Sequence, residues 1–221
     1  MNIKQFIQSL PIQTFVEIGM HFGIDTQDFR KMHPKARIVC FEPDPRNIEM
    51  IKKLGNDKIC ELYELAVSNT NKPMDFYLSS GDSRKRTENE IINSYDWSCS
   101  SSLKKPTGHL LEHEWVTFPT SVKVNCCKLD DFEPLKNTKI DFMWVDVQGA
   151  EDLVFSCAQE TLKNTHYVYT EFSNYELYEG QLNREKLMKF FKGYRIVPNV
   201  CPSPHPQHGG DILLKNMSFN K

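Results

Sequence analysis

The sequence predicts an α/β fold in which a mainly parallel sheet is covered by helices. Two short apolar runs, Thr14–Ile18 and Arg37–Phe41, enclose a segment with helical periodicity at residues 25–33, and together they indicate a β-α-β unit. Short apolar runs and helical patterns go on alternating along the chain, which is typical of parallel sheets. Polar residues directly follow the first two runs, at the edge where open α/β sheets bind ligands.

The later elements continue this alternation. The pattern predicts a helix at 46–54, a strand within 59–67, a strand at 140–146, a helix at 150–162, a strand at 167–172 and a helix at 184–191. Two final strands are expected at 194–198 and 211–215, joined by a loop rich in Pro, His and Gly. Because this connection contains no helix, we expect an antiparallel pair at one edge of the sheet.

A long polar segment, from Ser79 to about Thr120, interrupts the alternation. Strand patterns at 74–78 and 122–129 flank it. Long irregular segments of this kind are usually lids or disordered loops, so we expect a partly mobile lid over the active site at about 79–120. A chain of 221 residues fits one domain, and we expect a single domain that spans 1–221.

The bulk composition excludes several classes of protein. Hydrophobic residues make up 39% and charged residues 25%, and no apolar run is long enough to cross a bilayer. The formal charge of -2 provides no field that would attract a polyanion, so we expect no nucleic-acid partner. Residues 1–10 alternate polar and apolar side chains, unlike a signal peptide, and this favours a cytoplasmic protein. No pattern indicates an oligomeric state.

The cysteines are odd in number, and several lie in apolar contexts where a reduced thiol packs as a small hydrophobe. We expect free thiols in a reducing compartment at Cys40, Cys60, Cys99, Cys126, Cys127, Cys157 and Cys201. No C-x-x-C pair occurs, which argues against a structural zinc site and against a thioredoxin-type redox centre.

Two motifs after the first two strands indicate an adenosine-containing cofactor. Gly19 and Gly23 follow the first strand with the spacing E-x-G-x-x-x-G, and glycine there lets the backbone bend tightly and approach a ligand. Glu42 ends the second strand, where a carboxylate can accept hydrogen bonds from both hydroxyls of a ribose. Each feature alone also has a purely structural explanation, as a turn or a solvated strand end. Their joint order and context favour the cofactor.

The start of the next helix separates S-adenosylmethionine from NAD. A dinucleotide needs G-x-G-x-x-G spacing and a helix N-terminus that accepts its pyrophosphate, whereas here Asp25 and Asp28 lie in the first turn and would repel a phosphate. S-adenosylmethionine has no phosphate, only an ammonium, a carboxylate and a sulfonium. Glu17 can help to place the ammonium, and Thr26 with main-chain amides is available to the carboxylate.

At these motifs the chain resembles a known family, the FkbM-type S-adenosylmethionine-dependent methyltransferases. The similar pieces extend from about Thr14 to Gln181 and are FVEIGMHFGIDT, CFEPDP, LAVSN, KLDDF, IDFMWVDVQGAE and YTEFSNYELYEGQ, with DVQGAE the most specific. The resemblance implies a Rossmann-like class I methyltransferase fold, with a mixed seven-stranded sheet, helices on both faces and an antiparallel last strand. It also implies S-adenosylmethionine as the cofactor.

The resemblance further implies cofactor contacts from Glu17, Gly19, Gly23, Glu42 and Asp44, with Ala66 and Ser68 near the adenine. Other residues that we expect at the cofactor site are His21, Thr26, Pro43, Asp146 and Val147. Family members mostly methylate hydroxyl oxygens of sugars, glycans or small natural products, so the expected reaction is O-methylation of a sugar or glycan hydroxyl. The alternatives are a methyltransferase of another small molecule or of a protein, a non-catalytic Rossmann-like binding domain, and an NAD enzyme.

Methyl transfer from a sulfonium is an in-line displacement, in which the enzyme aligns the acceptor and removes its hydroxyl proton. Asp146 is the expected base, because its strand end faces the methionine portion of the cofactor in this fold. Asp146 could instead hold the cofactor's ammonium, and then Glu171, Glu151 or His208 would take the proton. The residues that we expect at the acceptor are Gln148, Glu151 and Tyr175.

A metal ion is a possible but less favoured addition. Asp146 and Glu171 could share a divalent cation that polarises the acceptor hydroxyl, but few hard oxygen ligands can be assigned. The loop at 201–210 has Cys and His at metal-like spacings, but its prolines favour a stiff exposed loop over a zinc site. Packing within loops explains His109 and His113, and it could also account for His21.

Overall fold

The computed structural model describes residues 2–82, 96–201 and 209–220. Its central sheet has the strand order β10-β11-β9-β8-β1-β2-β3. The strands of this sheet are β1 (Thr14–Ile18), β2 (Arg37–Phe41), β3 (Glu61–Tyr63), β8 (Ile140–Val145), β9 (Thr165–Ser173), β10 (Tyr194–Ile196) and β11 (Gly209–Asn216). Strand β11 is antiparallel to both its neighbours, while the other pairs are parallel. The predicted mixed seven-stranded sheet with an antiparallel last strand is therefore confirmed.

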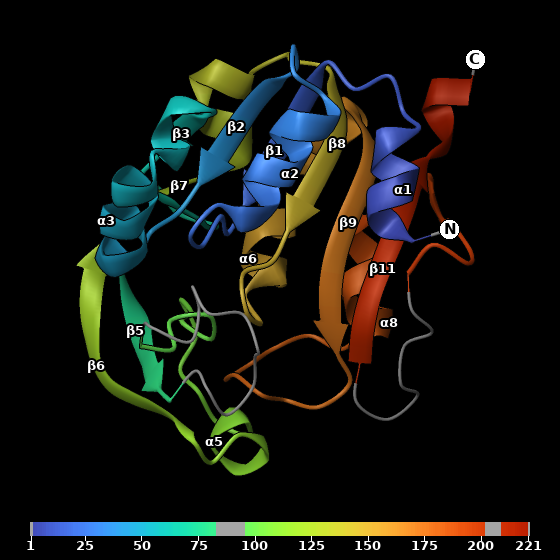
Figure 1. Cartoon of the computed structure of the whole chain (residues 1–221). Helices are drawn as coiled ribbons and strands as arrows, with labels where there is room; N and C mark the ends of the chain where they lie inside the picture. The colour runs from blue at the N-terminus through green and yellow to red at the C-terminus, as the bar shows by residue number, and fades with distance from the viewer. Residues whose placement is uncertain (1, 83–95, 202–208, 221) are drawn as a thin grey trace.

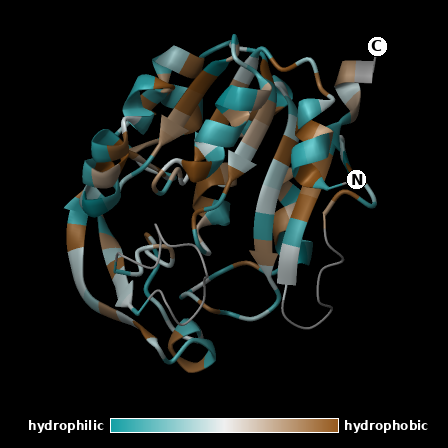
Figure 2. Ribbon diagram, viewed as in Figure 1, coloured by the Kyte–Doolittle hydropathy of each residue, from teal (hydrophilic) through white to brown (hydrophobic). Residues whose placement is uncertain are grey.

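Helices cover both faces of this sheet (Figure 1). One face carries α1 (Ile3–Gln8), α2 (Ile24–Met32) and α3 (Pro45–Leu54), and the other carries α6 (Glu151–Ser156), α7 (Gln159–Lys163) and α8 (Arg184–Leu187). Successive strand residues point to opposite faces, so Phe15 packs on Phe29 of α2 with ring centroids 3.9 Å apart. The next residue, Val16, packs in the cluster that contains Phe155 of α6. Figure 2 shows hydrophobic residues along the central strands and many hydrophilic ones on α3.

Local sequence signals set the ends of α2 and α3. Asp44 accepts a hydrogen bond from the Arg46 amide (2.9 Å), and Pro45 occupies the first position of α3. Gly55 ends α3 in the left-handed conformation, with φ of 75°. Gly23, with φ of 79°, precedes α2. Both helices begin and end within one residue of the predicted bounds.

The helix predicted at 150–162 is two helices in the structure. Ala158 separates α6 from α7 and is not helical (φ -124°, ψ 21°). The thiol of Cys157, just before the break, donates a hydrogen bond to the main-chain oxygen of Ser68 (2.9 Å). This tertiary contact with a distant segment cannot be seen in the local periodicity. The helix predicted at 184–191 is similarly shortened to α8, which continues as a 3-10 turn.

Two accessory strand pairs differ from the predicted strands. The strand expected within 59–67 is divided into β3 and β4 (Ala66–Val67), and β4 pairs with β7 (Cys126–Cys127) outside the central sheet. The strand expected at 122–129 is replaced by β7 and by β6 (Val116–Val124), which pairs antiparallel with β5 (Met74–Gly81). Most residues of β6 are not buried, so no apolar pattern marks its beginning.

Helix α1 is not among the predicted elements, although the sequence holds its signal. Asn2 accepts a hydrogen bond from the Gln5 amide, and the Gln5 side chain accepts one from the Asn2 amide, which makes a capping box. None of the helices in the part of the chain that the structure describes combines the length and apolar character needed to cross a membrane. All seven cysteines are free thiols.

The predicted lid begins and ends in the hairpin of β5 and β6. Residues 83–95 of this segment lie outside the described residues. From 96 to 115 the chain is packed and includes the short helix α5 (His109–Glu112), and Ser102 is fully buried. In Figure 1, β5, β6 and α5 lie at the end of the sheet toward which the arrowheads of β2, β8 and β9 point. The described part of the segment therefore lies at the edge where a ligand is expected.

Candidate active site

A cavity of about 210 Å³, open to solvent, lies at the carboxyl ends of β1, β2 and β8, and we call it the first pocket. The predicted cofactor residues that line it are Glu17, Gly19, His21, Glu42, Pro43, Ala66, Asp146 and Val147. The motifs that follow β1, β2 and β8, which carry the family resemblance, therefore meet in one cavity.

Gly19 lets two strand ends approach each other at the floor of the first pocket. Its φ is 91°, and a Cβ atom there would lie 1.8 Å from the main-chain oxygen of Asp146. The Asp146 amide donates to the oxygen of Ile18 (3.0 Å), and the Gly19 amide donates to the oxygen of Phe41 (3.0 Å). Only glycine combines this conformation with this contact.

Glu42 is held in one orientation by three donors. Its carboxylate accepts hydrogen bonds from the His21 amide (2.7 Å), the Asp44 amide (3.0 Å) and the Asn47 side chain (3.1 Å). Glu42 is 4% exposed, and its burial raises the pKa of the carboxyl to about 7. A fixed carboxylate beside an open cavity can accept hydrogen bonds from a ribose diol.

Glu17 is the most enclosed acid of the first pocket. The Thr26 hydroxyl donates to Glu17 Oε2 (2.5 Å), and the Cys40 thiol donates to the same oxygen (3.5 Å). Burial raises the pKa of Glu17 to about 8. Thr26 therefore supports Glu17 in the structure and does not line the cavity.

Three more predicted cofactor residues also lie behind the wall of the first pocket. Gly23 turns the chain into α2, and Asp44 caps α3 and pairs with Arg46 (2.7 Å). The Ser68 hydroxyl donates to the sulfur of Met74 (3.1 Å). These contacts favour a supporting role for Gly23, Asp44 and Ser68, because none of them lines the cavity.

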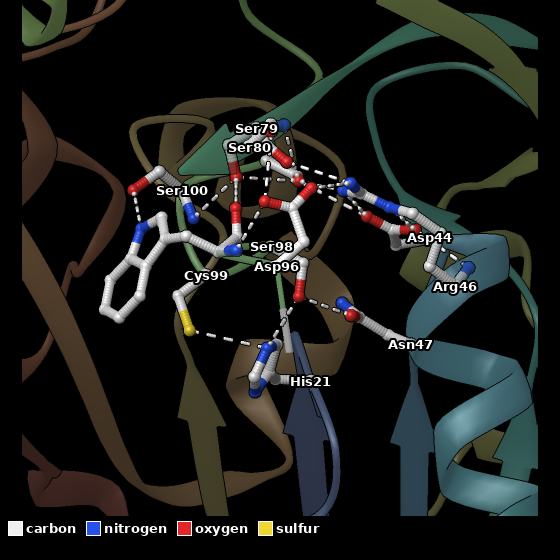
Figure 3. Close-up of polar contacts among 12 residues, drawn as sticks. His21, Asp44, Arg46, Asn47, Ser79, Ser80, Asp96, Ser98, Cys99 and Ser100 are labelled. Carbon is white, nitrogen blue, oxygen red and sulfur yellow. Dashed lines mark hydrogen bonds and ion pairs between the residues drawn. The ribbon is translucent and has the colours of Figure 1, made fainter. Parts of the chain in front are cut away.

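A closed ring of hydrogen bonds ties the predicted lid to Glu42, and Figure 3 shows the part of it in which Ser98 is linked to His21 and to Asn47. Asn47 donates to Glu42, the Ser98 hydroxyl donates to Asn47 Oδ1 (2.7 Å), and His21 donates its amide to Glu42. Since the hydroxyl hydrogen of Ser98 goes to Asn47, its oxygen accepts from His21 Nε2 (2.9 Å). Burial lowers the pKa of His21 to about 4, so its imidazole is neutral near pH 7. We call Glu42, Asn47, Ser98 and His21 the Glu42 ring.

A second set of contacts anchors the serine-rich part of this segment to the cap of α3 (Figure 3). Arg46 donates to the Ser79 oxygen (2.9 Å) and to the Ser101 hydroxyl (3.2 Å). The Ser101 hydroxyl in turn donates to Asp44 (3.3 Å), and it accepts from the Ser79 amide (3.0 Å). No motif in the sequence indicates a role for Ser98, Ser101 or Asn47. The run of serines at 100–102, which includes Ser101, is a local signal in this segment.

A second cavity, of about 300 Å³, adjoins the first, and we call it the second pocket. The residues that line it are Ser100, His109, His113, Gln148, Gly149, Glu151, Glu171, Phe172, Ser173, Leu177, Tyr178, Gln181, Gly209 and Gly210. Gln148 is shared with the first pocket. His109 and His113, interpreted from the sequence as loop-packing residues, thus lie in the wall of a cavity.

Gln148 lies at the boundary between the pockets in a left-handed conformation, with φ of 53°. Its side chain donates to Asp146 Oδ1 (2.7 Å) and to Glu171 Oε2 (3.5 Å). The amide of Gln148 therefore connects the ends of β8 and β9. The following Gly149 is also left-handed (φ 87°), and a Cβ there would meet the Tyr178 ring at 2.6 Å.

The three predicted catalytic acids divide between the two cavities. Asp146 lines only the first pocket, where its side chain is exposed, and the protein atoms around its carboxyl raise its pKa. Glu151 and Glu171 line only the second pocket. Glu151 is 4% exposed, it accepts a hydrogen bond from the Gly149 amide (3.2 Å), and burial raises its pKa to about 7.

The remaining predicted site residues lie elsewhere. Tyr175 is 45% exposed and lines neither pocket, so the structure does not place it at the acceptor side of the cavities. His208, an alternative base, lies outside the described residues. Among residues 2–82, 96–201 and 209–220, no group of three or more His, Cys, Asp or Glu is arranged to hold a metal ion.

Comparison with known proteins gives matches over most of the chain. A family model described as the methyltransferase FkbM domain matches residues 17–196. The 2-O-methyltransferase NoeI of Sinorhizobium fredii (strain NBRC 101917 / NGR234) is 35% identical over 208 residues, which cover 93% of this chain and 80% of that protein.

Solved structures show the same fold at low identity. The methyltransferase FkbM of Methylobacillus flagellatus KT is similar with a TM-score of 0.52 and 10% identity, over 92% of this chain and 43% of that chain. This chain thus spans less than half the length of that protein. The N-terminal domain of EvdMO1, solved in the presence of SAH and D-fucose, has a TM-score of 0.50 and 8% identity, over 97% and 80% of the two chains. The predicted Rossmann-like methyltransferase fold is confirmed.

Proposed function

This chain belongs to the FkbM methyltransferase family, and from that premise we propose that it transfers a methyl group from S-adenosylmethionine to a hydroxyl oxygen of a sugar or glycan. The charge of the first pocket carries the choice of donor. Of the described residues that line it, Glu17, Asp25, Glu42 and Asp146 are acidic and none is Lys or Arg. The donor has an ammonium and a sulfonium against one carboxylate, so its net positive charge complements this pocket.

Other features of the first pocket support the same donor. Glu42, fixed by three donors, accepts hydrogen bonds from the ribose hydroxyls in this proposal. Apolar side chains at Leu65, Phe76 and Leu103 surround the space available to an adenine. Asp146, at the end of β8, lies where the methionine portion is expected. A dinucleotide is disfavoured, because its two phosphates would lie among four acidic side chains, with no Lys or Arg among the described lining residues.

The choice of acceptor atom is supported by the relative and by the resemblance. NoeI is named a 2-O-methyltransferase, which describes transfer to an oxygen. The family resemblance implies sugars, glycans or small natural products as acceptors. We therefore place a sugar or glycan hydroxyl first, and another small molecule or a protein second.

Bound S-adenosylmethionine supplies an electrophilic methyl group. The protein must hold the acceptor oxygen in line with the methyl group, exclude competing water and receive the hydroxyl proton. Two carboxyls with a raised pKa are candidates to receive this proton. Asp146 lines the first pocket, and Glu151 lines the second pocket.

The donor is tested by calorimetry with S-adenosylmethionine and with NAD. We expect binding of the first and no detectable binding of the second. Tight binding of NAD without binding of S-adenosylmethionine would reject the proposal. Incubation with isotope-labelled donor and a panel of sugars and glycans, followed by mass spectrometry, should then detect a gained methyl group. A metal chelator should leave that rate unchanged.

A further inference from the structure

The second pocket meets the first pocket at Gln148. Gln148 lines both cavities, and its side-chain amide bonds to Asp146, which lines the first pocket, and to Glu171, which lines the second. A molecule in the second pocket would therefore reach the first pocket past the side chain of Gln148. Methyl transfer needs an acceptor oxygen in line with the methyl carbon and sulfur of the donor, and the second pocket is a space from which an acceptor could approach.

The wall of the second pocket has a distinct charge. Its described lining residues include the carboxylates of Glu151 and Glu171 and contain no Lys or Arg. Lys104, whose ammonium lies near this region, is paired with Asp152 (2.6 Å) and donates to the Gly180 oxygen (2.9 Å). An acceptor with a phosphate or carboxylate would meet these acidic groups, and the described lining residues hold no Lys or Arg to balance its charge, which is costly in an enclosed site.

The polar groups of this pocket fit a polyhydroxyl molecule. The rings of His109 and Tyr178 lie 5.4 Å apart (centroids) and form an aromatic wall. The Tyr178 hydroxyl donates to the oxygen of Ser100 (2.7 Å), so its proton is already used and the ring is fixed. Carboxylates beside aromatic faces can accept hydrogen bonds from sugar hydroxyls while the ring stacks on the sugar's apolar side.

Glu151 is the carboxyl of this pocket with the most defined orientation. It is 4% exposed, and one of its oxygens accepts from the Gly149 amide (3.2 Å). Gly149 directly follows Gln148, so Glu151 is tied to the turn that separates the two cavities. Glu171, by comparison, is exposed at the end of β9.

Resting on the proposed function, we propose that the second pocket is the acceptor site, that it selects uncharged or amino-substituted sugars over phosphorylated or carboxylated ones, and that Glu151 receives the acceptor's hydroxyl proton. Asp146 then stays with the donor, where it faces the ammonium. In the step, the acceptor oxygen forms the new bond to the methyl carbon as the carbon–sulfur bond breaks and its electron pair stays on sulfur. The hydroxyl proton goes to the Glu151 carboxylate, so the products are the methyl ether, S-adenosylhomocysteine and protonated Glu151.

The acidity of Glu151 is compatible with this role. Burial raises its pKa to about 7, with Asp146 and Asp152 as further negative charges, so it can accept a proton near neutral pH. The titratable or charged groups around it are Asp146, Asp152, Lys104, Glu171, His109, His113 and Tyr178.

The base is tested with Glu151→Gln, with Glu185→Gln as a matched control on an exposed part of α8. We expect Glu151→Gln to lower kcat by about 100-fold or more, as is typical when a general base is removed. Its affinity for S-adenosylhomocysteine should stay within about twofold of wild type, since Glu151 lies outside the donor pocket; this binding also shows that the variant is folded. The rise of wild-type kcat with pH through about 7, measured at saturating donor, should be absent from the residual activity of the variant.

Different outcomes separate the inference from the function on which it rests. Full turnover by Glu151→Gln, or loss of donor binding together with activity, would overturn the role of Glu151. If wild type binds S-adenosylhomocysteine but methylates no sugar in the panel, the proposed function fails and the inference fails with it.

The charge selectivity is tested on wild type with paired acceptors, a neutral methyl glycoside and the phosphate ester of the same sugar. We expect kcat/KM to be at least about tenfold higher for the neutral partner, a difference that one uncompensated charge contact readily supplies. Equal or inverted kcat/KM values would reject the assignment of the second pocket as an anion-excluding acceptor site.

Discussion

The first pocket is made by the ends of three central strands, whereas the second combines the ends of β9 and β11 with loops and the short helix α5. In the first, Gly19 and Asp146 are fixed by main-chain bonds between β1, β2 and β8. In the second, the His109 amide donates to the oxygen of Leu177 (3.0 Å), so two loops meet that are far apart in the sequence. The rigid sheet thus presents one shape to the donor, while the loops can vary the shape presented to an acceptor.

The largest effect should come from filling the closest approach in the first pocket. Gly19→Ala places a methyl group 1.8 Å from the oxygen of Asp146, and backbone on both sides prevents relief. We expect a loss of more than about 4 kcal/mol in the free energy of unfolding, beyond the usual range for one substitution. Gly55→Ala is the control, because its φ is also positive (75°) but nothing lies within 4 Å of the added Cβ.

Chemical denaturation of the two variants measures this difference. Gly55→Ala should lose only about 1–2 kcal/mol, the cost of the left-handed conformation itself. Similar losses in both variants would show that the strand ends of the first pocket can separate, and that the contrast in rigidity between the pockets is wrong.

Removing the ribose acid should be the next largest effect. Glu42→Ala deletes the carboxylate and leaves the donors from His21, Asp44 and Asn47 unpaired. We expect the affinity for S-adenosylhomocysteine to fall by about 100-fold or more, since several hydrogen bonds are lost at once. Titration calorimetry measures this, with Glu49→Ala on the exposed side of α3 as the control. Unchanged affinity in Glu42→Ala would show that the ribose does not bind at this strand end.

A smaller effect should appear as a dependence of stability on pH. Burial raises the pKa of Glu17 to about 8 and that of Glu42 to about 7, from 4.5, so the folded state binds these protons more tightly than the unfolded state. Their stabilising contribution is complete below pH 4.5 and is lost as the pH rises through 7 and 8. The unfolding temperature of the ligand-free protein should therefore fall between pH 6.5 and 8.5.

Glu17→Gln provides the control for this pH effect, because it removes the acid with the highest raised pKa and keeps the side-chain shape. The variant should show a shallower fall over the same range, measured by differential scanning fluorimetry. His21, whose pKa is lowered to about 4, affects stability only below its ordinary value of 6.5 and so does not disturb this window. A rise in unfolding temperature with pH would contradict the assignment.

The smallest predicted effect is in the wall of the second pocket. Tyr178→Phe removes the hydrogen bond to the Ser100 oxygen (2.7 Å) but keeps the ring. We expect a loss of about 1 kcal/mol in the free energy of unfolding, typical of one buried hydrogen bond. Donor affinity should not change. A large loss of donor affinity would show that the two pockets are not independent.

The first pocket could be predicted from the sequence, because its residues follow strands that are marked locally. β1 and β2 are buried on both faces and appear as short apolar runs, so Gly19 and Glu42 could be placed at their ends. The supporting roles of Thr26 and Asp44 could not be separated from direct contact, because the spacing of a motif does not show which way a side chain points.

Gln148, Glu151 and Glu171 of the second pocket are expected from the sequence at the acceptor side, but its wall at α5 could not be predicted, since that wall forms only when distant segments pair. Thr107 and His109 donate their amides to Leu177, and no local pattern in either segment indicates the other. The same limit explains the break between α6 and α7, where Cys157 bonds to Ser68 of another segment. The seven-stranded sheet, its antiparallel last strand and the residues of the donor site follow from local patterns and the resemblance, whereas the order of the strands and the loop wall of the second pocket depend on tertiary contacts.

The thiol of Cys99 lies in the wall of the first pocket, with its sulfur 3.4 Å from His21 Nε2. A bound donor would cover it, so alkylation by iodoacetamide should slow as the pocket fills. Of the other six cysteines, Cys60 and Cys201 are partly exposed like Cys99, and four are buried, namely Cys40, Cys126, Cys127 and Cys157. Peptide mass mapping of the alkylated residue would then give the donor's dissociation constant. The rate at which Cys99 is alkylated therefore measures how far the donor fills the first pocket, and this measurement needs no known acceptor.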